Sequence, residues 1–168
     1  MKNMLLCLTL LLVMLFLLVS NDDAQGHRNS AMNLECASCH LEGPPAKIII
    51  KGIPAKFQPG KAYQVTVEVV AKLKSLSESK GGFAVQASAG TLKVKDEKRT
   101  QILGDYLTHT PEGNKVRKWT FLWIAPTVEE EAIITVMGVA ANGDYAPCGD
   151  AVAADAVVSK KAMDKSKK

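Results

Sequence analysis

The chain has 168 residues, which is enough for one ordinary domain with flanking segments. Hydrophobic residues make up 47% of it, a share typical of a folded protein, so a wholly disordered chain is excluded. The formal net charge is +4, and lysines and arginines do not alternate with aromatic residues along any stretch. We therefore expect no nucleic-acid binding.

Residues 1–24 have the layout of a secretory signal peptide. A short basic head is followed by a Leu-rich, charge-free run over residues 4–19, and then by small and polar residues up to Ala24. The run is slightly shorter than the roughly 20 residues of a relaxed membrane span, so an uncleaved membrane anchor is the alternative. Cys7 lies inside the run and is taken as part of the signal. We expect an extracytoplasmic protein, whether periplasmic, on the cell surface or secreted.

Residues 25–46 form a segment that contains Cys36-Ala37-Ser38-Cys39-His40. The pattern Cys-x-x-Cys-His is typical of covalent haem attachment. The two thiols each bond one vinyl group of the porphyrin, and the adjacent imidazole ligates the iron. We therefore predict one covalent haem c, with Cys36 and Cys39 as thioether positions and His40 as proximal axial ligand. Export agrees with this prediction, because such attachment takes place outside the cytoplasm.

Two other functions of the same pentapeptide are less well supported. A structural zinc site usually has a second ligand pair downstream, whereas only the unpaired His109 and Cys148 follow here. A redox Cys-x-x-Cys usually begins a helix in a βαβ unit, whereas this chain is rich in strand patterns. Removal of the signal leaves three cysteines, an odd number that argues against a disulfide framework. Cys148 is then a lone thiol whose role the sequence leaves open.

The distal side of the iron has several candidate ligands. His109 stands at the end of a predicted strand and is the candidate distal axial ligand. The alternative is that His109 hydrogen-bonds locally within Thr108-His109-Thr110. His27 and Met32 precede the attachment motif, and Met137 is expected to be a core residue of its strand. An open or water-ligated iron is a further alternative.

Residues 47–159 show β patterns throughout, with no long amphipathic helix. Alternation is strongest around Ala62–Ala71 and over residues 115–125, where Trp119, Phe121 and Trp123 share one face and are expected in the core. Residues 82–92 and 102–110 are each predicted to form a single strand. The remaining strands are predicted near residues 48–50, 132–140 and 150–159.

These elements, about seven or eight short strands between turn residues, predict an all-β protein with an immunoglobulin-like antiparallel β-sandwich. The haem-binding loop segment precedes the sandwich. Residues 160–168 form a Lys-rich tail that we expect to be solvated, with docking to an acidic partner as the alternative.

Several segments follow one another in a distinctive order: FQPGKAYQVTV at 57–67, GFAVQA at 82–87, THT at 108–110, WTFLWIAP at 119–126, ANGD at 141–144 and GD at 149–150. This series resembles the Reeler domain and the related choice-of-anchor V type proteins of bacteria and archaea. The resemblance implies an immunoglobulin-like sandwich, and such proteins often carry CxxCH just ahead of the domain. Animal Reeler domains have disulfide cysteines, whereas this domain has only Cys148. The resemblance implies little about function, because the fold serves as a module in several surface contexts.

Together these features predict an exported monohaem c-type cytochrome that transfers electrons outside the cytoplasm and is not an enzyme. Its expected partner is a redox protein or another haem protein, and copies of the chain are expected to assemble with one another. Two alternatives remain. The chain is a non-redox surface binding or adhesion module with a structural haem or CxxCH, or it is a haem sensor with an open axial position.

Overall fold

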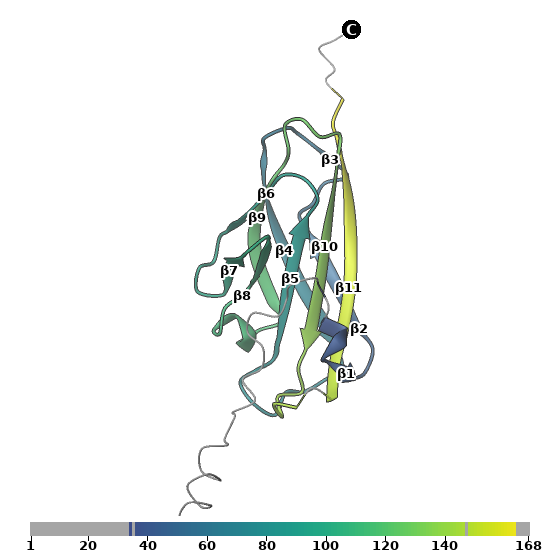
Figure 1. Cartoon of the computed structure of the whole chain (residues 1–168), viewed down its shortest axis with the longest axis vertical. Coiled ribbons are helices and arrows are strands. Elements are labelled where there is room, and N and C mark those ends of the chain that lie inside the picture. The colour runs from purple at the N-terminus through teal and green to yellow at the C-terminus, as the bar shows by residue number, and fades with distance from the viewer. Residues whose placement is uncertain (1–33, 35, 147, 164–168) are drawn as a thin grey trace, which may run out of the picture. The chain divides into compact units, whose positions relative to one another are not determined.

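The structure is a computed structural model that describes residue 34, residues 36–146 and residues 148–163. The predicted signal peptide, His27, Met32 and the last five residues of the tail lie outside the described residues. Eleven strands and two short 3-10 helices make up this part of the chain (Figure 1). They are η1 (Cys36–Ser38), β1 (Leu41–Glu42), β2 (Ala46–Lys51), β3 (Lys56–Phe57), β4 (Ala62–Ala71), β5 (Gly81–Ala87), β6 (Thr91–Val94), β7 (Thr100–Leu103), β8 (Tyr106–His109), η2 (Gly113–Lys115), β9 (Lys118–Ile124), β10 (Glu131–Ala140) and β11 (Cys148–Lys161).

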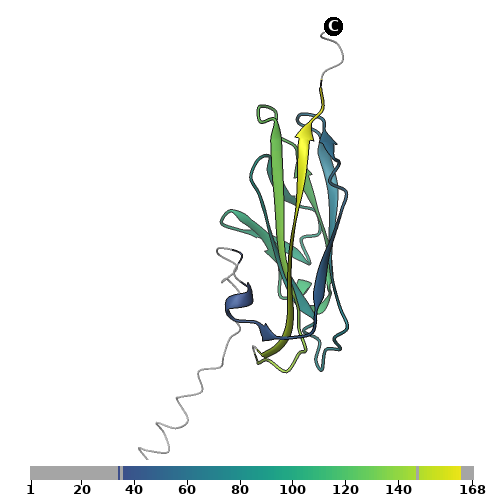
Figure 2. The same cartoon turned by 90° about the vertical axis from the view of Figure 1, so that its right-hand side faces the viewer.

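The strands form two sheets that face each other (Figures 1 and 2). The larger sheet has the order β1-β11-β10-β5-β8-β7, with β3 also paired to β11, and the smaller has the order β2-β4-β9-β6. Pairing is antiparallel except where the two-residue strands β1 and β3 run parallel to β11. The predicted all-β, immunoglobulin-like sandwich is therefore confirmed.

The core lies between the two sheets and is built from alternating residues of the long strands. Trp119, Phe121 and Trp123 on β9 are all buried, as their spacing predicts. Across the interface, Phe83 of β5 stacks on Trp119 with ring centroids 4.5 Å apart. Trp123 meets Phe57 edge to face at 5.7 Å. The β alternation therefore defines the inner face of the smaller sheet correctly.

Two predicted strands are each divided in the structure. Residues 82–92 contain nearly all of β5, a crossing to the other sheet, and the start of β6. Gly90 allows this crossing because its φ of +84° lies in the left-handed region, and a Cβ there would be 2.4 Å from the Ile124 carbonyl oxygen. Residues 102–110 overlap a hairpin, in which β7 and β8 are joined at Gly104-Asp105. Hydrophobic pattern alone did not reveal either break, because both sides of each break continue the β pattern.

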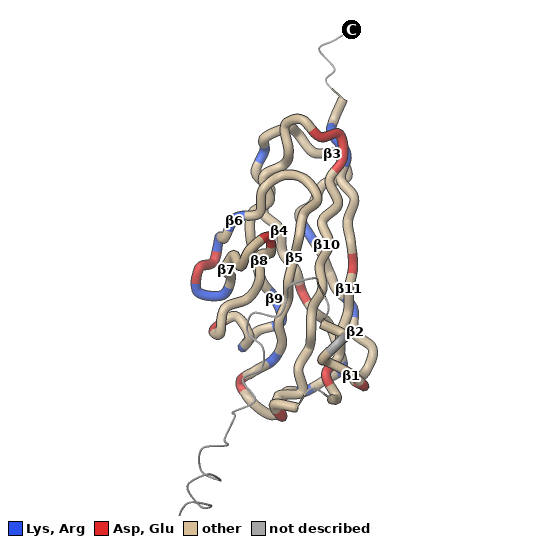
Figure 3. Tube along the Cα trace, in the orientation of Figure 1, with Lys and Arg blue, Asp and Glu red and all other residues tan. Residues whose placement is uncertain are grey.

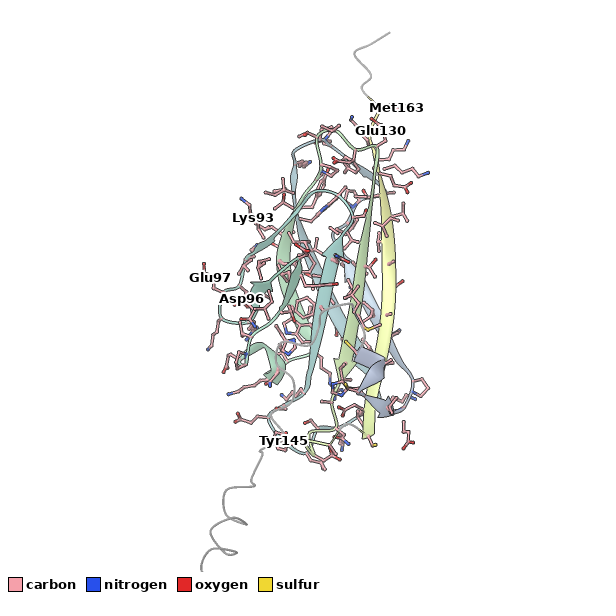
Figure 4. All side chains as sticks on the ribbon, viewed as in Figure 1. Lys93, Asp96, Glu97, Glu130, Tyr145 and Met163 are labelled. Carbon is pink, nitrogen blue, oxygen red and sulfur yellow. The ribbon has the colours of Figure 1, made fainter. Side chains whose placement is uncertain are left out.

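The predicted attachment segment lies at one end of the larger sheet. At one end of the sandwich, β10 ends and β11 begins, and η1 and β1 lie beside them (Figure 1). Tyr145, in the loop between β10 and β11, marks the same end (Figure 4). Charged residues of both signs are interspersed along the described chain (Figure 3). Among the described residues, no helix is long and apolar enough to span a membrane.

Candidate functional site

The motif Cys36–His40 folds into one tight turn. The carbonyl oxygen of Cys36 accepts hydrogen bonds from the backbone N–H groups of Cys39, at 3.3 Å, and His40, at 2.9 Å. The turn therefore brings the backbone of Cys39 and His40 back to that of Cys36.

This turn packs on the outer face of the larger sheet (Figure 2). The backbone N–H of Cys36 donates to the sulfur of Met137, on β10, at 3.2 Å. Met137 was expected in the core, and that expectation is wrong: its neighbour Val136 points inward and is fully buried, whereas Met137 points outward and is only half-buried. The near-continuous apolar sequence of β10 hid the alternation that places Met137 beside the motif.

The backbone after the turn is fixed to β11. Leu41 pairs with Cys148, and Glu42 pairs with Asp150. Gly43 then approaches β11 so closely that a Cβ there would be 2.1 Å from the carbonyl oxygen of Asp150. A glycine at this position thus lets the attachment segment lie directly against the first residues of β11.

The side chain of His40 is held by a buried carboxylate. Its Nδ1 lies 2.7 Å from Oδ2 of Asp150, and the exposed fractions of the two side chains are 37% and 4%. An ionised carboxylate only accepts hydrogen bonds, so Nδ1 carries the proton and donates it. The lone pair of the imidazole is then on Nε2. This arrangement fits an axial iron ligand, because metal-binding histidines commonly donate their second ring N–H to a carboxylate or carbonyl.

Asp150 has its own fixed surroundings. Its other carboxylate oxygen accepts the backbone N–H of Asn142 at 2.8 Å. The negative charge of Asp150 also acts on Arg117, where it raises the guanidinium pKa against the larger, opposite effect of burial. Arg117 donates to the carbonyl oxygens of Lys80, Leu73 and Ala141 at 2.7, 2.8 and 3.0 Å. A network of backbone and charged groups therefore supports the carboxylate behind His40.

The cysteines of the described chain are not joined by disulfides. Burial raises the pKa of the Cys36 thiol, and the nearby Cys39 adds to that rise, while a backbone hydrogen bond opposes it. The Cys36 thiol therefore stays protonated at neutral pH. Cys39 and Cys148 are exposed. No group of three or more His, Cys, Asp or Glu side chains is arranged to hold a metal ion within the part of the chain that the structure describes.

His109 lies on β8, away from this turn and along the edge of β5. Its Nδ1 lies 3.2 Å from both the backbone nitrogen and the carbonyl oxygen of Phe83, and its ring centroid is 6.5 Å from that of Trp119. A Cβ on Gly82 would be only 2.5 Å from the ring, so the imidazole packs tightly against that glycine. Burial lowers the pKa of His109. The structure thus favours the local hydrogen-bonding role and does not bring His109 together with His40.

No protein-family model matches the chain, and no curated protein sequence matches it. Solved structures do match. The Reelin-N domain of F-spondin has a TM-score of 0.54 and 19% identity, over 76% of this chain and 96% of that one. A human F-spondin reeler domain has a TM-score of 0.51 and 19% identity, over 73% of this chain and 93% of that one. The chain therefore has a Reeler-like β-sandwich fold, as its sequence motifs suggested.

Proposed function

We propose that the chain is an exported monohaem c-type cytochrome that carries electrons outside the cytoplasm. The observation that supports this most is the turn at Cys36–His40, in which the backbone of Cys39 and His40 folds back onto Cys36 and Nδ1 of His40 is bonded to Asp150. A bare Cys-x-x-Cys-His match requires only spacing. Here the histidine is also oriented, with its iron-binding nitrogen left unprotonated.

In this proposal, Cys36 and Cys39 would hold haem c through two thioether bonds, and Nε2 of His40 would bind its iron. The bound haem supplies one-electron chemistry between ferric and ferrous iron. The chain's own residues fix the cofactor to a rigid sheet: β1 pairs with β11, and Asp150 holds the imidazole. Because the turn lies on the outer face of the sheet, a redox partner protein or another haem protein can approach it.

The proposed location is extracytoplasmic, because the layout of residues 1–24 is that of a secretory signal or an uncleaved anchor. If the anchor is retained, the protein associates with the membrane through that segment. Assembly with copies of itself would place several haems within reach of one another. We propose electron transfer, and no enzymatic activity, for this site.

The test is expression of the full chain with a haem-maturation system. We expect the reduced pyridine adduct to show the bands of haem c, and the mass of the polypeptide to include one haem. The double substitution Cys36→Ser with Cys39→Ser should abolish covalent attachment, whereas Cys148→Ser should retain it, because Cys148 lies outside the turn. A wild-type chain that leaves the maturation system without covalent haem would refute the proposal.

A haem sensor with an open axial position is the second candidate, and the placement of His109 favours it. The hydrogen bond with Phe83 and the packing against Gly82 keep this imidazole in its strand. Ferrous protein that is high-spin and binds carbon monoxide rapidly would identify the sensor. A low-spin, six-coordinate spectrum would favour electron transfer, and His109→Ala would test whether that residue supplies the sixth ligand.

A further inference from the structure

We propose that Asp150 is a positioning residue that sets the reduction potential of the haem through His40. This inference rests on the proposed function, since it needs His40 on iron. The carboxylate is 4% exposed, and its Oδ2 lies 2.7 Å from Nδ1 of His40. The two residues are 110 positions apart in the chain, so the contact depends on the fold.

The carboxylate is held in place from several sides. A buried carboxylate is costly unless hydrogen bonds and opposite charge compensate for the loss of water. The Asn142 N–H occupies one oxygen of Asp150, and the charge of Arg117 is close enough to be affected by that of Asp150. The second oxygen is then directed at His40. The fold thus places a carboxylate, Asp150, opposite the Nδ1–H of His40. A neutral backbone carbonyl would be enough to accept that hydrogen bond.

An anionic acceptor has a specific electronic effect. Hydrogen bonding from Nδ1–H to a carboxylate makes the imidazole a more basic ligand than bonding to a neutral carbonyl. A more basic axial ligand stabilises ferric iron relative to ferrous iron, which lowers the reduction potential. Asp150 therefore lowers the reduction potential relative to the same site with a neutral acceptor.

The first experiment compares reduction potentials of the haem-loaded full chain with and without Asp150→Asn. The amide removes the negative charge at nearly constant shape. We expect the equilibrium between ferric and ferrous iron to shift about tenfold toward the ferrous form. For one electron, this is a rise in the reduction potential of about 59 mV. Asp155→Asn is the matched control. It removes a carboxylate from the same strand, but its side chain is exposed and accepts only the Ala156 N–H.

The outcomes separate this inference from the proposed function. An unchanged potential in Asp150→Asn, with haem attached and the fold retained, would refute the role of Asp150 and leave the cytochrome intact. An equal shift in Asp155→Asn would also refute it, because the potential would then respond to the loss of any negative charge on this strand and not to the contact with His40. Wild-type protein without covalent haem would instead refute the proposed function.

A second measurement requires no substitution, in case Asp150→Asn fails to fold or to take up haem. In the full chain before haem attachment, nitrogen-15 NMR of the histidine rings reports which nitrogen is protonated. We expect His40 to carry its proton on Nδ1, with slow exchange caused by the bond to Asp150. A His40 ring protonated on Nε2 at neutral pH would overturn the inference.

Discussion

At the residue scale, His109 is an imidazole whose pKa is lowered by burial in the fold. The loss of water around the ring outweighs a hydrogen bond with the backbone of Phe83, which acts in the opposite direction and raises the pKa. The unfolded chain binds a proton at about pH 6.5, whereas the folded chain does so only at lower pH. Below about pH 6.5, the unfolded state therefore holds more protons than the folded one, and the free energy of unfolding falls as pH falls.

We predict that His109→Gln weakens this pH dependence. Urea unfolding near pH 7.5 and near pH 5 should show a smaller loss of stability in the variant than in the wild type. The remaining ionisable groups are common to both proteins, so their contributions cancel in the difference. An equal loss in both proteins would mean that His109 takes up its proton as readily in the folded state as in the unfolded one.

The Cys-x-x-Cys-His motif is visible in the sequence because its spacing is local. The contact between His40 and Asp150 is not visible there, because it depends on the register between β1 and β11. In the sequence, Asp150 belongs to a short Gly-Asp segment and begins a predicted strand. The burial of its carboxylate is what indicates the role of Asp150, and burial cannot be read from the sequence.

At the element scale, Arg117 connects three segments at the same end of the sandwich. Its guanidinium donates to carbonyl oxygens of Leu73, Lys80 and Ala141, which lie after β4, before β5 and after β10. Only the planar five-donor fork of arginine can reach all three with this geometry. This side chain therefore fixes the loop over residues 72–80 against the end of β10.

We predict that Arg117→Lys lowers the free energy of unfolding by about 1–3 kcal/mol, because it leaves half-buried carbonyl groups without donors. Denaturant unfolding measures the change. Arg99→Lys is the control, since Arg99 is exposed and lies 4.0 Å from Asp96, a distance at which an exposed ion pair contributes little. Equal effects of the two substitutions would contradict a specific role for Arg117.

The strands themselves were largely predictable. Ala62–Ala71 has the predicted bounds, and the strands around Ile48–Ile50, Lys118–Ile124 and Glu131–Ala140 are present. Period-two alternation gave these elements because one face of each is buried. The two-residue strands β1 and β3 were missed, since so short a segment has no period to detect. Their parallel pairing with β11 is a tertiary contact.

At the scale of the whole molecule, the two sheets separate the aromatic core from the proposed haem. The inner face of the larger sheet packs on Trp119 and Trp123, while its outer face carries η1. These are the only tryptophans of the chain. They are 1% and 0% exposed, and their indole N–H groups donate to the carbonyl oxygens of Gly113 and Ala89. Both indoles are thus held in place in the core, on the inner side of the larger sheet.

This arrangement predicts strong quenching of tryptophan fluorescence in the haem-loaded protein. Sheets pack about 10 Å apart, so a haem on the outer face lies on the order of 20 Å from both indoles. Haem absorbs where tryptophan emits, and energy transfer is efficient at such distances. We expect emission from the folded, loaded chain to be a small fraction of that from the haem-free Cys36→Ser, Cys39→Ser chain. Emission should rise in urea, where the expanded chain moves the indoles away from the covalently attached haem. If the loaded and haem-free proteins emit equally while folded, the haem does not lie on this face of the sandwich.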